Sequence, residues 1–257
     1  PAFWEYGAQW DQHLCSDGFV FKDKENCLAI YSDKHDPTQE RTCKEIARFS
    51  EKDAETWRRI SDLEQSDEYQ RVQMDMVFNP AELRMKPEIM MRQAEVYPKL
   101  VESGMEPDGM ILAASAIRVA REWFDSPELQ SCILRFAVSS VVDITEPSQG
   151  GMIVGMATTL STIGFNRGGT HHVAHAAHQL LTQMGCEFFI NQEVEKVIIE
   201  NGSATGVRLK DGSEIAARKL VVSAGLSPEQ LVFDMIGREH VDERTARRVE
   251  LLERTFG

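Results

Sequence analysis

The sequence predicts an α+β or α/β protein, in which a small sheet and a mostly helical region precede a second part built of a β-meander and parallel strands. Three observations support this prediction. Short β-rich runs open the chain, helix-start signals recur between residues 38 and 142, and Asn-Gly and Asp-Gly turns separate short β-branched runs after residue 194.

Composition bounds the class of protein. The chain has 257 residues, of which 42% are hydrophobic and 27% charged, which is typical of a globular protein with one or two domains. Lys and Arg number 28 against 41 Asp and Glu, giving a formal net charge of −13. Such a field repels phosphate backbones, so we expect no nucleic-acid partner.

The five cysteines lie far apart and form no C-x-x-C motif, which indicates a reducing compartment and a cytoplasmic protein. The longest apolar run, Met110–Ala116, is too short to span a bilayer, so any membrane contact would be peripheral. Because the chain begins at Pro1 without an initiator Met and ends at Gly257 directly after an amphipathic stretch, we expect it to be a piece of a larger polypeptide.

Elements of the first part follow from local signals. The runs Gly18–Phe21 and Cys27–Tyr31 are separated by polar residues and predict a hairpin. Four helix starts are predicted, by Ser50 with Asp53 three residues later, by Pro87 at a first helical turn, by Asp108 before a helix over 109–124, and by Ser126 before Pro127.

Between residues 145 and 169 the chain becomes rich in Gly, Ser and Thr. Gly150-Gly151 and Gly168-Gly169 predict tight turns or close approach of the backbone, and a domain boundary. After this boundary the sequence predicts, in chain order, a helix over 170–184, a strand over 187–190, a three-stranded antiparallel meander over 194–217, a buried parallel strand over 220–224, and a helix opened by Ser227-Pro228.

This second part resembles the phytoene desaturase-like flavoprotein oxidoreductases. The family order is Gly-Gly, a helix, a Gly, a short strand, a V-x-x-I strand, a G-V-x-L strand, a D-G turn and a V-V-S-A strand. The matching residues in this chain are Gly168-Gly169, Gly185, Val194-Glu-Lys-Val-Ile, Gly206-Val-Arg-Leu, Asp211-Gly212 and Val221-Val-Ser-Ala-Gly225. The stretch from Ile46 to Ala54 is similar to the start of a helix in the family's substrate domain, so the resemblance extends over most of the chain.

The resemblance implies part of a Rossmann-like FAD domain over residues 167–225, between two segments, 1–166 and 226–257, of a substrate-binding domain. It implies hydrogen transfer across a carbon bond of an apolar substrate, with no catalytic residue assigned. Small residues at the end of a parallel strand also let a flat ligand approach the backbone. The residues implied to contact FAD are Val194, Ser223, Ala224 and Gly225, with Gly168 and Gly169 at the join of the two domains.

Two departures from the family pattern concern the cofactor. No two glycines are spaced as G-x-G, so the fingerprint that places a pyrophosphate on a helix N-terminus is absent from this chain. The Gly-Asp motif that the family carries near the flavin is also absent. The chain therefore resembles the middle of such a flavoprotein, and we expect that alone it binds FAD poorly or not at all.

Two other functions stay open. One is a non-catalytic binding or assembly module that has lost its flavin site. The other is a zinc enzyme, because His171, His175 and His178 share one helical face, although no H-E-x-x-H motif is present and a solvated or interface face is the preferred interpretation. The eleven methionines are typical of core filling, or of a pocket for a flexible apolar substrate.

Overall fold

The computed structural model describes residues 3–22, 26–79, 83, 86–102, 104–105, 110–111, 113–139, 143–219, 221–223 and 225–252. The chain forms two compact units, residues 1–180 and residues 181–256. Each unit combines helices with a small antiparallel sheet, so the described part of the chain is α+β. Within it, none of the helices has both the length and the apolar character to cross a lipid bilayer.

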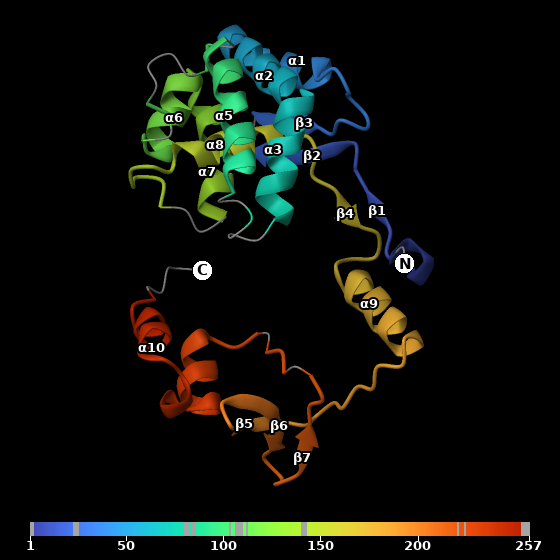
Figure 1. Cartoon of the computed structure of the whole chain (residues 1–257). Coiled ribbons are helices and arrows are strands. Elements are labelled where there is room, and N and C mark those ends of the chain that lie inside the picture. The colour runs from blue at the N-terminus through green and yellow to red at the C-terminus, as the bar shows by residue number, and fades with distance from the viewer. Residues whose placement is uncertain are drawn as a thin grey trace. The chain divides into compact units, whose positions relative to one another are not determined.

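Two antiparallel strand pairs lie in the first unit. β2 (Cys15–Val20) pairs with β3 (Cys27–Tyr31), which confirms the predicted hairpin. β1 (Trp10–Asp11) pairs with β4 (Phe165–Asn166), so segments near the two ends of the unit lie side by side (Figure 1). Arg167 reinforces this pairing, because its guanidinium lies 2.6 Å from the carboxylate of Asp11.

The helices described between residues 40 and 159 follow this hairpin in the chain. They are α1 (Glu40–Ala47), α2 (Glu51–Glu64), α3 (Asp67–Phe78), α5 (Pro87–Glu102), α6 (Ala116–Trp123), α7 (Pro127–Ser139) and α8 (Gly150–Thr159). Three of the four predicted helix starts are confirmed, whereas Asp108 lies outside the described residues and α6 begins only at Ala116, after Ser115. The hydroxyl of Ser50 accepts a hydrogen bond from the Asp53 N–H at 3.1 Å, α5 begins at Pro87, and α7 begins at Pro127.

One hydrophobic core joins these helices to β3. Its largest fully buried side chains include Phe124 and Ile133 from the α6–α7 region, Ile30 from β3 and Ile153 from α8. α8 contacts α2, α6 and α7, so it lies inside the group of helices (Figure 1). The sequence predicts only turns and a domain boundary in this region, and the buried helix α8 is a correction to that prediction.

Gly150 explains how α8 reaches the centre of the core. A Cβ added at Gly150 would lie 1.9 Å from the carbonyl oxygen of Ile111 and 2.8 Å from a methyl of Val119. The close backbone approach predicted at Gly150 is thus confirmed, but it serves helix packing and not a turn. The apolar side chains that follow, such as Ile153, then enter the core.

The second unit contains a three-stranded sheet of order β5–β6–β7, formed by β5 (Val194–Glu200), β6 (Ser203–Leu209) and β7 (Glu214–Ala216). Both pairings are antiparallel, which confirms the predicted meander. Asn201 (φ 50°) and Gly202 (φ 76°) both adopt the positive φ of the tight turn that joins β5 to β6. After the sheet come η2 (Gln230–Ile236), η3 (Arg238–His240) and α10 (Glu243–Glu250).

Two predicted strands of this unit do not form. Residues 187–190 and 221–223 have no regular secondary structure, and Leu220 and Ala224 lie outside the described residues. The strand pairings of the described residues are all antiparallel. A buried parallel strand needs hydrogen-bonding neighbours on both sides, and the sequence pattern alone does not supply them. The parallel, Rossmann-like part is therefore not confirmed.

The helix α9 (His171–Gln183) confirms the helix predicted over 170–184. The division between the two units falls within α9. Inside the second unit, η2 contacts β5. The expected domains, 1–166 with 226–257 for substrate and 167–225 for cofactor, stay a prediction.

Candidate functional site

Gly168 and Gly169 form the turn that leads into α9. Both have a positive φ, 77° and 96° respectively, a conformation that glycine adopts at little cost. A Cβ at Gly168 would lie 2.4 Å from the imidazole Nε2 of His172, so the first turn of α9 closes over this glycine. The N–H of Gly169 donates to the carbonyl of Asn166 at 2.9 Å, which ties the turn to β4.

The histidines predicted to share one face of α9 do so. The rings of His171 and His175 stack with their centroids 5.9 Å apart, and a nitrogen of the His175 ring lies 2.9 Å from the side-chain amide nitrogen of Gln179. Across the residues that the structure describes, no group of three or more His, Cys, Asp or Glu side chains is arranged to hold a metal ion. The histidine face is exposed, and the zinc-enzyme hypothesis gains no support from this geometry.

The methionines divide between two environments. Met105 is buried in the core and Met156 packs against it, as core filling requires. Others on the first unit are exposed, at 57% for Met74, 68% for Met91 and 43% for Met110. Neither interpretation of the methionines covers the whole set.

Val194, one of the residues implied to contact FAD, begins β5. It lies opposite Leu209 in the sheet, and a register shift separates it from Lys196. Next to it, the carbonyl of Glu193 accepts a hydrogen bond from the Lys210 N–H at 3.0 Å, and the side chains of these two residues form an ion pair. The backbone at Val194 is thus held at the end of the meander by paired groups on both strands.

Ser223 and Gly225 lie in the exposed segment between β7 and η2. Gly225 has a φ of 80°, and nothing lies within 4 Å of the position of an added Cβ. Ala224 lies outside the described residues. An open backbone with small residues is compatible with a flat ligand edge, and it provides no positive charge of its own.

Two apolar segments of the second unit are exposed. One coincides with the strand predicted over 187–190, and the other with the parallel strand predicted over 220–224. In the first, Phe188, Phe189 and Ile190 are 45%, 64% and 80% exposed. In the second, Val222 is 77% exposed, and Leu226, just after it, is 41% exposed. Exposed apolar runs of this kind mark surfaces that contact another protein segment, a membrane or a ligand. The run Phe-Phe-Ile was visible in the sequence, but only the structure shows that it is left uncovered.

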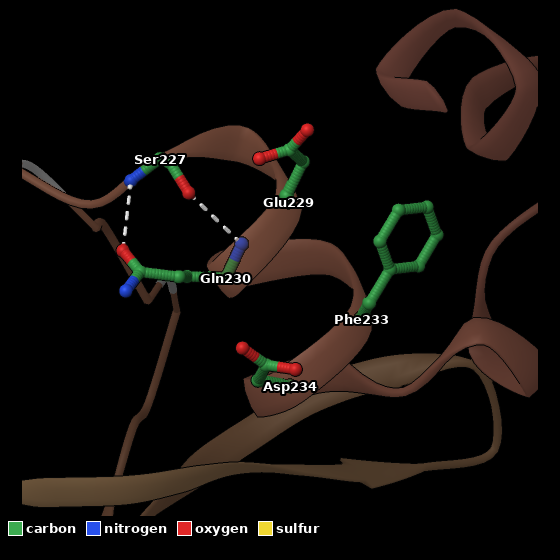
Figure 2. Close-up of a pocket in the computed structure, with 5 residues that line it drawn as sticks. All are labelled: Ser227, Glu229, Gln230, Phe233 and Asp234. Atoms are coloured by element: carbon green, nitrogen blue, oxygen red, sulfur yellow. Dashed lines mark hydrogen bonds between the residues drawn. The ribbon is translucent and has the colours of Figure 1, made fainter.

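A pocket of the second unit lies at the start of η2, shortly after Gly225 in the sequence (Figure 2). Its lining residues are Ser227, Glu229, Gln230, Phe233 and Asp234. The sequence indicated the helix start at Ser227 but not the pocket. The Ser227 hydroxyl accepts from the Gln230 N–H at 3.1 Å, and the Gln230 side-chain oxygen accepts from the Ser227 N–H at 3.3 Å (Figure 2).

This pocket does not fit a pyrophosphate. The reciprocal hydrogen bonds of Ser227 and Gln230 already occupy two N–H groups at the helix start, which a phosphate would otherwise use. The carboxylates of Glu229 and Asp234, which also line it, repel a second anion. The start of η2 thus offers no cradle for the phosphates of a dinucleotide.

Parts of the chain are similar in sequence to known carotenoid enzymes. The chain is 38% identical over 58 residues to 4,4'-diapophytoene desaturase (4,4'-diapolycopene-forming) of Methylomonas sp, which is 23% of this chain and 11% of that protein. It is 31% identical over 115 residues to the chloroplastic prolycopene isomerase of Daucus carota, which is 44% of this chain and 19% of that protein. It is 38% identical over 58 residues to the neurosporene-forming phytoene desaturase of Rhodobacter capsulatus, which is 22% of this chain and 11% of that protein. No protein-family model matches the chain.

These relatives confirm the resemblance to the phytoene desaturase-like family that the motifs predict. The aligned part of the chain spans between about a tenth and a fifth of the length of these relatives.

Proposed function

We propose that the chain is the central part of an FAD-dependent oxidoreductase that adds or removes hydrogen across a carbon bond of an apolar substrate. Its similarity to carotenoid desaturases supports the class of reaction. One structural observation supports the proposal that flanking sequence is needed to complete the cofactor-binding domain. The strand-like segments 187–190 and 221–223 are apolar and exposed, and no described strand pairs with them.

The physical argument rests on what such segments need. Exposed Phe189, Ile190 and Val222 side chains leave apolar surface in water, and its burial against a neighbouring strand would be favourable. A parallel sheet supplied by flanking sequence would cover both segments and place the open backbone at Gly225 near the carboxyl edge of its strands. That edge is where flat ligands bind in sheets of this kind.

The cofactor would depend on the same flanking sequence. FAD carries two phosphates, and this chain has a net charge of −13 and no G-x-G fingerprint. Backbone contacts at Val194 and Ser223–Gly225 would position an adenine or ribose edge without neutralising the phosphates. Flavin supplies the hydride chemistry when it is bound, so the protein mainly orients the substrate, and no general base is assigned.

The remaining features of the proposal are the partner and the location. We infer an apolar small-molecule substrate in a cytoplasmic protein, which contacts a membrane only from its surface when it collects that substrate. The relation to carotenoid enzymes supports the apolar substrate. The dispersed cysteines support the reducing compartment.

The test compares the 257-residue chain with the longest polypeptide that its reading frame encodes. We expect the short chain to elute from gel filtration without flavin absorbance, and the long polypeptide to carry about one equivalent of FAD. In the long polypeptide, Gly225→Val should reduce FAD content at least about tenfold, because a side chain at a close backbone approach displaces the ligand.

Gly202→Val is the matched control. Gly202 also has a positive φ, 76° against 80° at Gly225, and no described atom lies within 4 Å of an added Cβ at either position, so the backbone strain is similar. Gly202 lies in the turn between β5 and β6, at the opposite end of β5 from Val194, and its variant should keep FAD. Equal loss in both variants would contradict the cofactor contact at Gly225. If the long polypeptide carries no flavin, the result favours the non-catalytic binding module instead. If the short chain carries flavin, the proposal that it lacks the phosphate-binding part of the FAD site is wrong.

A further inference from the structure

Helix α5 has two apolar faces, and only one of them is buried. The buried side chains of this helix, each 6% exposed, are Ile89, Val96 and Leu100. A second face is exposed, at 48% for Met90, 36% for Tyr97 and 47% for Val101. A surface helix normally has one apolar face and one polar face, so the second apolar face of α5 is unusual.

The exposed apolar residues of α5 form a continuous stripe. Residues 90, 94, 97 and 101 follow an i, i+4, i+7, i+11 pattern, which places them on one side of a helix with ~3.6 residues per turn. The neighbouring positions around the helix, residues 87, 91 and 98, are also apolar and exposed. The residues of this α5 stripe are Pro87, Met90, Met91, Ala94, Tyr97, Pro98 and Val101.

A row of glutamates borders the α5 stripe. Glu88, Glu95 and Glu102 are spaced seven residues apart, so they follow one another along one side of the helix, and all three are exposed. Among the residues that the structure describes, none forms an ion pair with this glutamate row. Its negative charge is therefore available to a partner.

Two cations of α5 lie beyond the glutamate row and pair with α3. The guanidinium of Arg92 lies 2.8 Å from the carboxylate of Asp75, and the ammonium of Lys99 lies 2.5 Å from the carboxylate of Glu68. Helices α3 and α5 contact each other (Figure 1). Because these cations are engaged by α3, the charges that border the stripe on this side are the three glutamates.

Pro98 removes one helical hydrogen bond inside the α5 stripe. It has no N–H, so it cannot donate to the carbonyl of Ala94, four residues earlier in the helix. Both residues are exposed. A partner that places a donor group over the stripe would satisfy this carbonyl.

Charge distinguishes the kinds of partner that would cover such a stripe. A membrane surface with anionic lipids repels the glutamate row. A symmetric dimer brings the same patch of two copies together, so the two glutamate rows would repel each other. A helix whose apolar face is bordered by Lys or Arg would bury the stripe and pair with the glutamates.

We propose that the α5 stripe is a docking surface for a basic amphipathic helix of another protein. The apolar face of the partner packs on Met90, Tyr97 and Val101, and its Lys or Arg side chains pair with the glutamate row. The flexible thioethers of Met90 and Met91 adapt to the side chains that the partner presents. Docking at this surface does not depend on the cofactor.

Two synthetic helical peptides of about 18 residues test the surface, by fluorescence anisotropy with the whole 257-residue chain. Both peptides carry leucines along one face, which lysines border in one peptide and glutamates in the other. We expect the lysine peptide to bind at least about tenfold more tightly than the glutamate peptide. Equal binding of the two peptides would overturn the proposal.

A double variant locates the contact on α5. Met90→Gln combined with Val101→Gln should weaken binding of the lysine peptide at least about fivefold, because it makes the stripe polar. Val138→Gln on α7 is the matched control, since Val138 is also apolar and 57% exposed. It should bind as the wild type does, and equal weakening in the control would overturn the proposal. All these side chains are exposed, and circular dichroism verifies that the variants fold.

Charge reversal separates the glutamate row from the charge of the whole protein. Glu88→Lys, Glu95→Lys and Glu102→Lys together should reverse the preference, so that the glutamate peptide binds more tightly. The triple variant stays acidic overall, because the wild type has a net charge of −13. A general attraction to the acidic protein would therefore keep the preference for the lysine peptide, and that result would overturn the proposal.

The other occupants give different results in the same double variant. Co-sedimentation with phosphatidylcholine vesicles that the double variant abolishes would identify the stripe as a membrane contact. A concentration-dependent dimer of the wild type that the double variant abolishes would identify it as a contact between copies of this chain. We expect neither, and either result would overturn the proposal.

Discussion

The carboxylate of Asp53, on α2, accepts hydrogen bonds from both the N–H and the hydroxyl of Ser126, at 2.9 and 2.5 Å. It also accepts from the N–H of Asp125 at 2.7 Å. Ser126 directly precedes α7, so a side chain of one helix satisfies the backbone at the start of another. Asp53 is fully buried and binds α2 and α7 to each other, although they are far apart in the sequence.

Replacement of Asp53 should therefore destabilise the first unit. We expect Asp53→Ala to cost about 3 kcal/mol of unfolding free energy, because it leaves the buried N–H and hydroxyl of Ser126 without their charged partner. Urea unfolding followed by tryptophan fluorescence measures the loss. Asp125→Ala is the control, since its ion pair with Lys52 is exposed and should contribute less than about 1 kcal/mol. Similar losses in the two variants would contradict this assignment.

Two glycines of α8 should respond to alanine with opposite signs. Gly150→Ala places a methyl 1.9 Å from the carbonyl oxygen of Ile111, so we expect a loss of about 3 kcal/mol in unfolding free energy. Among the described residues, the atom nearest to a Cβ added at Gly155 is the side-chain amide nitrogen of Gln73, at 4.0 Å. There, the higher helix propensity of alanine should stabilise the protein by about 0.5–1 kcal/mol. The same unfolding assay measures both, and a stabilising Gly150→Ala would refute the close packing of α8.

The meander should also require a glycine at position 206, because a side chain there would clash with the backbone of the next strand. A Cβ at Gly206 would lie 2.5 Å from the carbonyl oxygen of Ile215 on β7, so Gly206→Ala should separate β6 from β7 at a cost of about 2 kcal/mol. The second unit has no tryptophan, so hydrogen exchange of residues 203–216 is the measurement. Protection should fall at least about tenfold.

Gly18, in β2, provides the matched control for Gly206. It also lies in a strand, but nothing lies within 4 Å of an added Cβ. Gly18→Ala should leave exchange in the β2–β3 hairpin unchanged or slightly slower, because alanine loses less backbone entropy than glycine. Unchanged exchange in Gly206→Ala would show that the family-like glycine of this strand has no packing role.

Elements with local causes could be predicted from the amino-acid sequence. Ser50 with Asp53, Pro87, and Ser126 before Pro127 mark helix starts because their side chains or rings act within one turn, and Asn201-Gly202 sets a hairpin because both residues tolerate positive φ. The motifs also indicated the family, as the relatives confirm.

Features that depend on distant residues emerge only in the folded chain. The backbone contact of Gly150 with Ile111 makes a glycine-rich segment a buried helix. The hydrogen bond from the Trp57 indole to Gln39 depends on the packing of α2 beside the β3–α1 turn. Residues 187–190 and 221–223 carry strand-like sequence, yet they stay irregular. A strand, unlike a helix, obtains its hydrogen bonds from other segments, and no sequence pattern within the strand can provide them.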